Sequence, residues 1–327
     1  MKKLLSLSIF IILCFPHSSV AQLRSTTSEV FELSSIAFRL AGAEEYKQCP
    51  VSSYAKDIDE YFASYSDHEL IEYIKEIREK YLIGYDAVAN AAAYLVIHDG
   101  KITISPNFDT SRISGVDERW TAEVYGKYVE LLNDFYKDSY FNNFYSDHQK
   151  LYTAATSRLD KLLNNINTKW FRSFFGEELG DVRIVASFCT GNCNYAFSML
   201  NKNNGFGIVI GCNADGKGLP VYSKLMPQTI IHELSHGFTN KLINNIWGDI
   251  ELAALKIYPH VEQRMLEIAI GFPKNVMAEW FTDLCVNMYF RENKATKGMS
   301  SVFQIAMQQN KGFIWMERSV DFMNGFH

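Results

Sequence analysis

The chain has 327 residues, of which 47% are hydrophobic, 14% aromatic and 21% charged, and its formal net charge is −5. This composition is typical of a globular protein and excludes a disordered or collagen-like chain. Seven prolines and 19 glycines, against 18 tyrosines and 23 phenylalanines, favour a mainly helical fold over a turn-rich β-sandwich.

The first 21 residues predict a secretory signal peptide. Two lysines precede an apolar run at residues 4–15, and Ser19-Val20-Ala21 places small residues where a signal peptidase reads them. Leu13 stands where lipoprotein processing requires a small residue, which argues against acylation of Cys14. We therefore expect a mature protein that begins at Gln22 and is secreted or periplasmic. No later run approaches 18 apolar residues, so we expect no membrane span.

Export changes the charge and the cysteine count. The chain without its signal peptide has 30 basic and 37 acidic residues, a net charge of −7, and no basic run that could follow a phosphate backbone. We expect no nucleic-acid partner. Five cysteines remain, so an oxidising compartment leaves at least one free thiol. Cys189 and Cys193 could close a small loop, and the alternative is that these thiols are buried as small apolar residues.

The N-terminal region, residues 22–175, has a helical hydrophobic period almost throughout. A stretch that is apolar nearly all round, at 85–96, predicts a central buried helix. A short strand is expected after the Asp99-Gly100 turn, at 101–105. The other predicted helices of this region lie at 30–40, 70–81, 122–136 and 146–174, the last with a break.

The pattern changes at residue 176. Alternating and β-rich segments within 182–212 predict a small antiparallel sheet, and helices follow from about Pro227, Glu251 and Lys274. A helical first region followed by a short sheet and further helices predicts an α+β fold. Residues 176–327 therefore differ in pattern from the helical region before them.

One segment, at residues 227–238, reads PQTIIHELSHGF. A proline suits the first turn of a helix, and apolar residues recur every four positions, so the segment predicts a helix over 227–244. His232 and His236 lie one turn apart on one face, where both imidazoles can bind a single zinc ion. Glu233 lies beside that face and can act as general base toward a water molecule without binding the metal.

A hydrolytic zinc site needs a third protein ligand and an open fourth position. The helix predicted at 274–291 has Glu279 and Asp283 four residues apart, on the face opposite its apolar residues. We expect Glu279 to bind the metal and Asp283 to accept a hydrogen bond from the far ring nitrogen of His232 or His236. The alternative third ligands are His260, Glu262 and Glu267.

The segments HELSH at 232–236 and EWFTD at 279–283 resemble the gluzincin class of zinc metallopeptidases. In that class two histidines and a glutamate on a later helix hold the metal, and an aspartate follows the glutamate by one turn. The resemblance implies that residues 176–327 form a zincin-like catalytic region, which hydrolyses peptide bonds with one Zn²⁺ per chain. The 43 positions from His236 to Glu279 exceed the spacing of the thermolysin branch. Residues 29–42 and 236–240 also resemble a family of secreted bacterial proteins with no assigned function.

Supporting groups for such a site are less sharply defined by the sequence. Asn240, one turn beyond His236, could support the site from behind the ligand or end the helix. The gluzincin resemblance implies an edge strand that pairs with an extended substrate, and residues 206–212 or 195–200 would serve. The candidate donors for the transition-state oxyanion are Tyr258, His260, Tyr289 and Arg291.

The sequence thus predicts a secreted zinc metallopeptidase that acts on a peptide or protein substrate. Two alternatives belong to other functional classes. One is a non-catalytic binding or surface protein that keeps the zinc helix as structure, although a carboxylate at the Glu233 position speaks for catalysis. The other is a metal-dependent hydrolase of a different amide bond, which would use the same metal, base and water.

Overall fold

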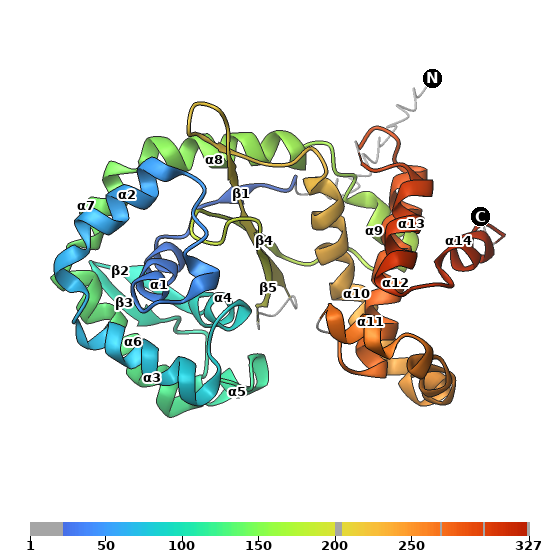
Figure 1. Cartoon of the computed structure of the whole chain (residues 1–327), viewed down its shortest axis with the longest axis horizontal. Coiled ribbons are helices and arrows are strands. Elements are labelled where there is room, and N and C mark those ends of the chain that lie inside the picture. The colour runs from blue at the N-terminus through green and yellow to red at the C-terminus, as the bar shows by residue number, and fades with distance from the viewer. Residues whose placement is uncertain (1–21, 200–204, 269, 297, 326–327) are drawn as a thin grey trace, which may run out of the picture.

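A computed structural model of the chain describes residues 22–199, 205–268, 270–296 and 298–325 (Figure 1). The predicted signal peptide lies outside the described residues. The fold is mainly helical α+β, which confirms the predicted class. The helices before the sheet are α1 (Glu29–Leu40), α2 (Ser52–Tyr61), α3 (Glu69–Tyr81), α4 (Asp86–Ala92), α5 (Ile113–Val116), α6 (Ala122–Asp138), α7 (Phe141–Asp147), α8 (Gln149–Leu163) and α9 (Lys169–Phe175). Short 3-10 turns occur at Glu44–Tyr46, Ala63–Tyr65 and Thr110–Arg112.

The first helix forms for the reasons that its sequence indicates. The Ser28 side chain caps α1 by accepting a hydrogen bond from the backbone N–H of Phe31. The predicted apolar stripe is buried, and Leu33 and Ile36 are fully inaccessible to solvent. Helix α1 therefore forms one side of the hydrophobic core against which the sheet packs.

Residues 85–96 form a short helix and a strand, not the single buried helix that their apolar pattern predicts. Helix α4 ends at Ala92, and β2 (Leu95–His98) pairs antiparallel with β3 (Lys101–Ile104). Asp99 and Gly100 have φ angles of 48° and 70°, as a two-residue hairpin turn requires. A continuous apolar run does not by itself distinguish a buried helix from a buried strand, and here the turn decides the outcome.

Four strands form the main sheet, which is mixed and not antiparallel throughout. Their spatial order is β1-β4-β6-β5, with β5 and β6 antiparallel and β4 parallel to both β1 and β6. The sheet is mixed because β5 occupies the outer edge, so that β6 enters between β4 and β5. The strands are β1 (Ser25–Thr26), β4 (Val182–Ser187), β5 (Asn194–Ser198) and β6 (Phe206–Gly211), and the short pair β7 (Asn213–Ala214) and β8 (Pro220–Val221) follows.

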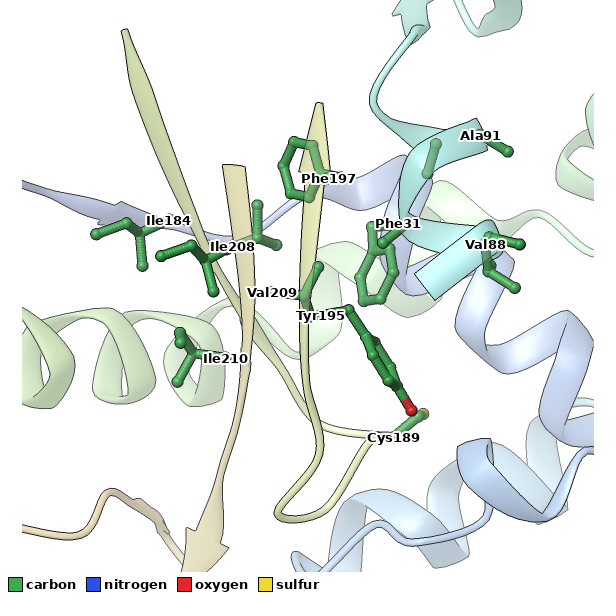
Figure 2. Close-up of a cluster of buried hydrophobic side chains, with 14 of the residues drawn as sticks. Phe31, Val88, Ala91, Ile184, Cys189, Tyr195, Phe197, Ile208, Val209 and Ile210 are labelled. Carbon is green, nitrogen blue, oxygen red and sulfur yellow. The ribbon is translucent and has the colours of Figure 1, made fainter. Parts of the chain in front are cut away.

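The two faces of this sheet meet different helices. One face, on which Tyr195 and Val209 are paired across β5 and β6, lies on the side of Phe31 of α1 and Val88 of α4 (Figure 2). Ile208 points to the opposite face (Figure 2), on which the Phe206 ring lies beside Gly237 of α10. Side chains alternate along a strand, so the β5 residues on either side of Tyr195 face the same side as α10.

The long helix α10 (Met226–Ile257) follows the sheet and contains the HELSH segment. The sequence predicts one helix at 227–244 and another from about Glu251, but α10 is continuous. It continues because Ile250 packs against the hydrophobic core and Ala254 is buried in it. A 3-10 turn at Tyr258–His260 ends it, and the remaining helices are α11 (Glu262–Glu267), α12 (Pro273–Glu292), α13 (Ser301–Lys311) and α14 (Met316–Asn324).

A hydrophobic cluster contains residues of both predicted regions, 22–175 and 176–327. In Figure 1 helices α1 to α6 lie on one side of the four-stranded sheet and α10 to α14 on the other. The cysteines at 49, 189, 193, 212 and 285 are free thiols, so Cys189 and Cys193 do not close a disulfide loop. None of the helices within the described ranges is long and apolar enough to cross a lipid bilayer.

Candidate metal centre

The N-terminal part of helix α10 contains two histidines, and buried residues anchor it in the core. Pro227 stands in its first turn, where a missing backbone N–H costs nothing. Ile230 and Leu234 are fully buried, which fixes the rotation of the helix about its axis. His232 and His236 consequently lie together on a partly open face, with 20% and 18% of their side chains exposed. A solvent-borne ion can therefore reach both imidazoles.

Helix α12 packs closely against this part of α10 because small polar residues line the contact. Ser235, Thr239 and Thr282 are fully buried there. The hydroxyls of Thr239 and Thr282 are 2.6 Å apart, and Thr239 also donates to the backbone carbonyl of Ser235. This short approach brings Glu279, one turn before Asp283 on α12, to the histidine face of α10.

His232, His236 and Glu279 converge on a common point. The two Nε2 atoms are 3.1 Å apart. One oxygen of Glu279 lies 3.4 Å from His232 Nε2, and the other lies 3.4 Å from His236 Nε2. These three residues offer ligand atoms that all lie within 4.8 Å of one another. The structure therefore contains a possible metal-binding triad made of the predicted residues.

The far ring nitrogens of the two histidines are also held. His232 Nδ1 lies 3.1 Å from Asp283 Oδ1, as the sequence predicts for one of the two histidines. His236 Nδ1 lies 3.4 Å from the predicted Asn240 Oδ1 and 3.3 Å from Thr282 Oγ1, a partner that the sequence analysis missed. Bonds of this kind fix the ring orientation and leave Nε2 free for a metal.

The carboxylates on α12 make the triad attractive to positive charge. Burial lowers the pKa of His232, but hydrogen bonds with Asp283 and Glu279 outweigh this effect and raise the pKa to about 10. Burial raises the pKa of Glu279 and of Asp283, and contacts with His232 outweigh it, so both pKa values lie below their usual range. The carboxylates thus stabilise positive charge on His232.

The triad lies in an open cleft of about 530 Å³, and Glu233 lines the same cleft. Residues 194–196 of β5 form part of the opposite wall. Of the two strand segments considered for substrate pairing, 206–212 corresponds to β6, which is interior, and 195–200 corresponds to the edge strand β5. Leu200 lies outside the described residues.

Tyr85 also lines the cleft, and the sequence analysis missed it. It precedes α4 and has φ 50° and ψ −127°, a strained backbone conformation for a bulky residue. The Tyr46 hydroxyl donates to the Tyr85 backbone carbonyl at 2.7 Å, which helps to hold this conformation. The side chain remains 57% exposed. No sequence signal beyond the preceding Gly84, which suggests a turn, points to this residue.

Two of the four donors considered for the oxyanion, Tyr258 and Tyr289, have hydroxyl groups that are bonded elsewhere. The Tyr258 hydroxyl donates to the backbone carbonyl of Gly271. The Tyr289 hydroxyl is buried and accepts a hydrogen bond from the backbone N–H of Asn167. The sequence does not indicate these contacts, because they depend on how the C-terminal helices pack. The described residues that line the cleft include none of the four candidates, Tyr258, His260, Tyr289 and Arg291.

The fold and the site define a mainly helical α+β protein with a His-His-Glu cluster that can hold a metal ion. The chain belongs to the family described as Domain of unknown function (DUF4932), whose family model matches residues 18–325. Searches of curated proteins and of solved structures returned no match. The family description names no activity, so a function has to come from the residues of the site.

Proposed function

We propose that this protein is a secreted zinc-dependent metallopeptidase. The observation that carries the proposal is the convergence of His232, His236 and Glu279, with Glu233 in the same open cleft. The signal peptide predicted for the first 21 residues supports secretion.

The donor set and its spacing fit zinc. A tetrahedral Zn²⁺ about 2.0 to 2.1 Å from its ligands requires ligand atoms roughly 3.3 Å apart. The two Nε2 atoms are 3.1 Å apart, and each lies 3.4 Å from a different oxygen of Glu279, so the cluster is close to this spacing. Two nitrogens and one oxygen are also the ligand types of hydrolytic zinc sites, which keep a fourth position for water or substrate.

When bound, zinc supplies a Lewis acid that polarises the scissile carbonyl and lowers the pKa of a water molecule in the site toward about 7. Glu233 accepts the proton of the attacking water and delivers it to the nitrogen of the leaving amine. Asp283 holds His232 as the Nδ1–H tautomer, so that Nε2 is the ligand atom. His236 is held in the same sense by Asn240 and Thr282.

Tyr85 is the hydroxyl donor that we assign to the developing oxyanion. A peptide carbonyl gains negative charge on its oxygen in the transition state, and a preorganised O–H donor there lowers the barrier. Tyr85 lines the cleft with Glu233 and the triad, and it is exposed to a bound substrate. Its strained backbone supports this role, because such conformations persist mainly where function requires them.

The cleft favours peptide hydrolysis over the two alternative functions. A structural zinc site is closed by four ligands and needs no base, whereas here a carboxylate adjoins three ligands in an open cleft. The edge strand β5 favours a peptide over another amide. Its outer side pairs with no other strand in the described part of the chain, and an extended peptide can add there through main-chain hydrogen bonds.

The experiment compares zinc-loaded protein, residues 22–327, with its Glu233→Gln variant on a peptide library. We expect the wild type to cleave peptides and the variant to keep zinc while losing roughly 10²- to 10⁴-fold in rate. Glu251→Gln, a change at an exposed carboxylate on the same helix, is the matched control and should retain activity. A wild type that binds zinc and cleaves no peptide would contradict the proposal.

A further inference from the structure

Two cavities meet at the candidate metal centre. The cleft of about 530 Å³ contains the triad, and a smaller cavity of about 290 Å³ lies beside it. His232 and Lys311 are the two described residues that line both cavities. Lys311 therefore lies where a ligand that occupies both would pass the metal centre.

Lys311 is held in place by its own helix. It is the last residue of α13, which is pinned to α12 by side-chain bonds of Gln308. Gln308 Nε2 donates to the backbone carbonyl of Asp283 at 3.2 Å, and Asn287 Nδ2 donates to Gln308 Oε1 at 2.6 Å. The backbone of Lys311 consequently has a fixed position, one helical turn beyond the buried contact of Gln308.

The positive charge of Lys311 is only partly neutralised. Its Nζ lies 3.7 Å from Asp283 Oδ2, a long contact, while the other oxygen of Asp283 bonds His232. Its side chain is 44% exposed. In the described linings of the two cavities it is the sole Lys or Arg, and the carboxylate of Asp86 across the cleft is already paired with Arg119 at 2.7 Å.

The smaller cavity has an apolar part beside Gln228, Thr229, His232 and Asp283, which with Lys311 form its polar part. A cavity of this kind accepts an apolar side chain, because burial of its surface is favourable. The apolar lining consists of Leu225, Val286, Met299 and Met307.

We propose that Lys311 binds a carboxylate of the substrate, next to the bond that is cleaved. The proposal rests on the metallopeptidase function proposed above and specifies its substrate class. An ammonium group with an exposed face forms a charge-assisted hydrogen bond with a carboxylate, which is stronger than a neutral one. The apolar walls beside Lys311 favour the C-terminal carboxylate of a peptide that ends in an apolar residue. An acidic side chain is the other source of the same group.

A purely structural role of Lys311 makes a different prediction. If Lys311 only balanced the charge of Asp283, its loss would weaken the metal centre and slow all substrates equally. A carboxylate-binding role changes the ratio between substrates that have and lack the carboxylate. The selectivity ratio therefore separates a specificity-determining residue from a structural one.

The first experiment uses two peptides of one sequence, with an apolar last residue and either a free or an amidated C-terminus. We expect zinc-loaded wild type to prefer the free acid by roughly tenfold or more in kcat/KM, Lys311→Met to lose this preference, and Lys311→Arg to keep it. A second pair of peptides, both amidated, has either Glu or Gln at an internal position. A preference for the Glu peptide would show that Lys311 binds the carboxylate of an acidic side chain. Lys224→Met, a change at an exposed lysine outside both linings, should leave the ratio unchanged.

The second readout is binding without turnover. The Glu233→Gln protein should bind the free acid more tightly than the amide by a similar factor, and adding Lys311→Met should abolish the difference. Equal cleavage of all peptides by wild type, or a preference that survives in Lys311→Met, overturns the role of Lys311 and leaves the peptidase proposal standing. If wild type cleaves none of them, the proposed function itself fails.

Discussion

Asp283 Oδ1 lies 3.1 Å from His232 Nδ1, on the side of the ring away from the nitrogen that faces His236 and Glu279. The carboxylate therefore orients the imidazole and increases its basicity as a ligand. We expect Asp283→Asn to weaken zinc binding by roughly 10- to 100-fold without unfolding the protein. Competition with a chromophoric chelator measures this affinity.

Asp249→Asn is the matched control for that substitution. Asp249 lies on the exposed part of α10, away from the triad, so the affinity for zinc should not change. Equal zinc affinity of Asp283→Asn and wild type would show that Asp283 does not support the ligand.

Tyr85→Phe removes one hydroxyl from the cleft wall. Because the hydroxyl is expected to act on the transition state, kcat should fall by roughly 10²-fold, as for loss of one oxyanion donor, with KM and zinc content nearly unchanged. Tyr140→Phe is the control, since Tyr140 also has positive φ (49°) and an exposed ring but does not line the cleft. Steady-state kinetics on one peptide compare the two variants with the wild type. Equal kcat values of Tyr85→Phe and the wild type would remove Tyr85 from the mechanism.

The ligand pattern of the site is predictable from sequence, whereas its walls are not. His232, Glu233 and His236 are set by helical periodicity alone, and so is the four-residue step from Glu279 to Asp283. These relationships are local, so a correct prediction of the two helices was enough to place each set of side chains on one face.

The remaining parts depend on contacts between distant segments. Tyr85 reaches the cleft from the N-terminal region and Lys311 from the end of α13, and neither has a local signal. The parallel pairing of β4 with β6 was missed for a similar reason. The sequence predicts an antiparallel sheet, but β6 enters between two earlier strands and pairs parallel with β4.

Glu32 should make the stability of the protein depend on pH. Burial raises the pKa of this carboxyl group to about 7, although the Tyr54 hydroxyl donates to it and partly opposes the shift. The folded state therefore holds this proton more tightly than the unfolded state, whose glutamate pKa is about 4.3. The free energy of unfolding should consequently fall as the pH rises from about 4.3 to 7, by on the order of 3 kcal/mol from this group.

Glu32→Gln tests this effect because the amide stays neutral at every pH and can still accept from Tyr54. Urea unfolding at several pH values should show a smaller decline in stability over that range for the variant. Glu44→Gln, at an exposed position, should keep the decline of the wild type. An identical pH dependence of wild type and Glu32→Gln would contradict the assignment.

Gly207 on β6 is required by its neighbour on the edge strand. A Cβ atom there would lie 1.9 Å from the Phe197 ring, which packs across β5 and β6. We expect Gly207→Ala to destabilise the protein by roughly 1 to 3 kcal/mol or more, as overpacking does, and to displace β5 from the cleft. Gly248→Ala meets open space inside helix α10 and should stabilise by roughly 0.5 to 1 kcal/mol. Thermal unfolding measures the stability of both variants, and similar stabilities would contradict the close packing of Gly207 against Phe197.

The central claim is that two imidazoles and a carboxylate hold one zinc ion, and zinc content measured by mass spectrometry after dialysis tests it most directly. We predict about one zinc per chain for the wild type and for His260→Ala, and a large loss for Glu279→Ala. A wild type that retains no zinc, or a Glu279→Ala variant that retains it fully, would contradict the account.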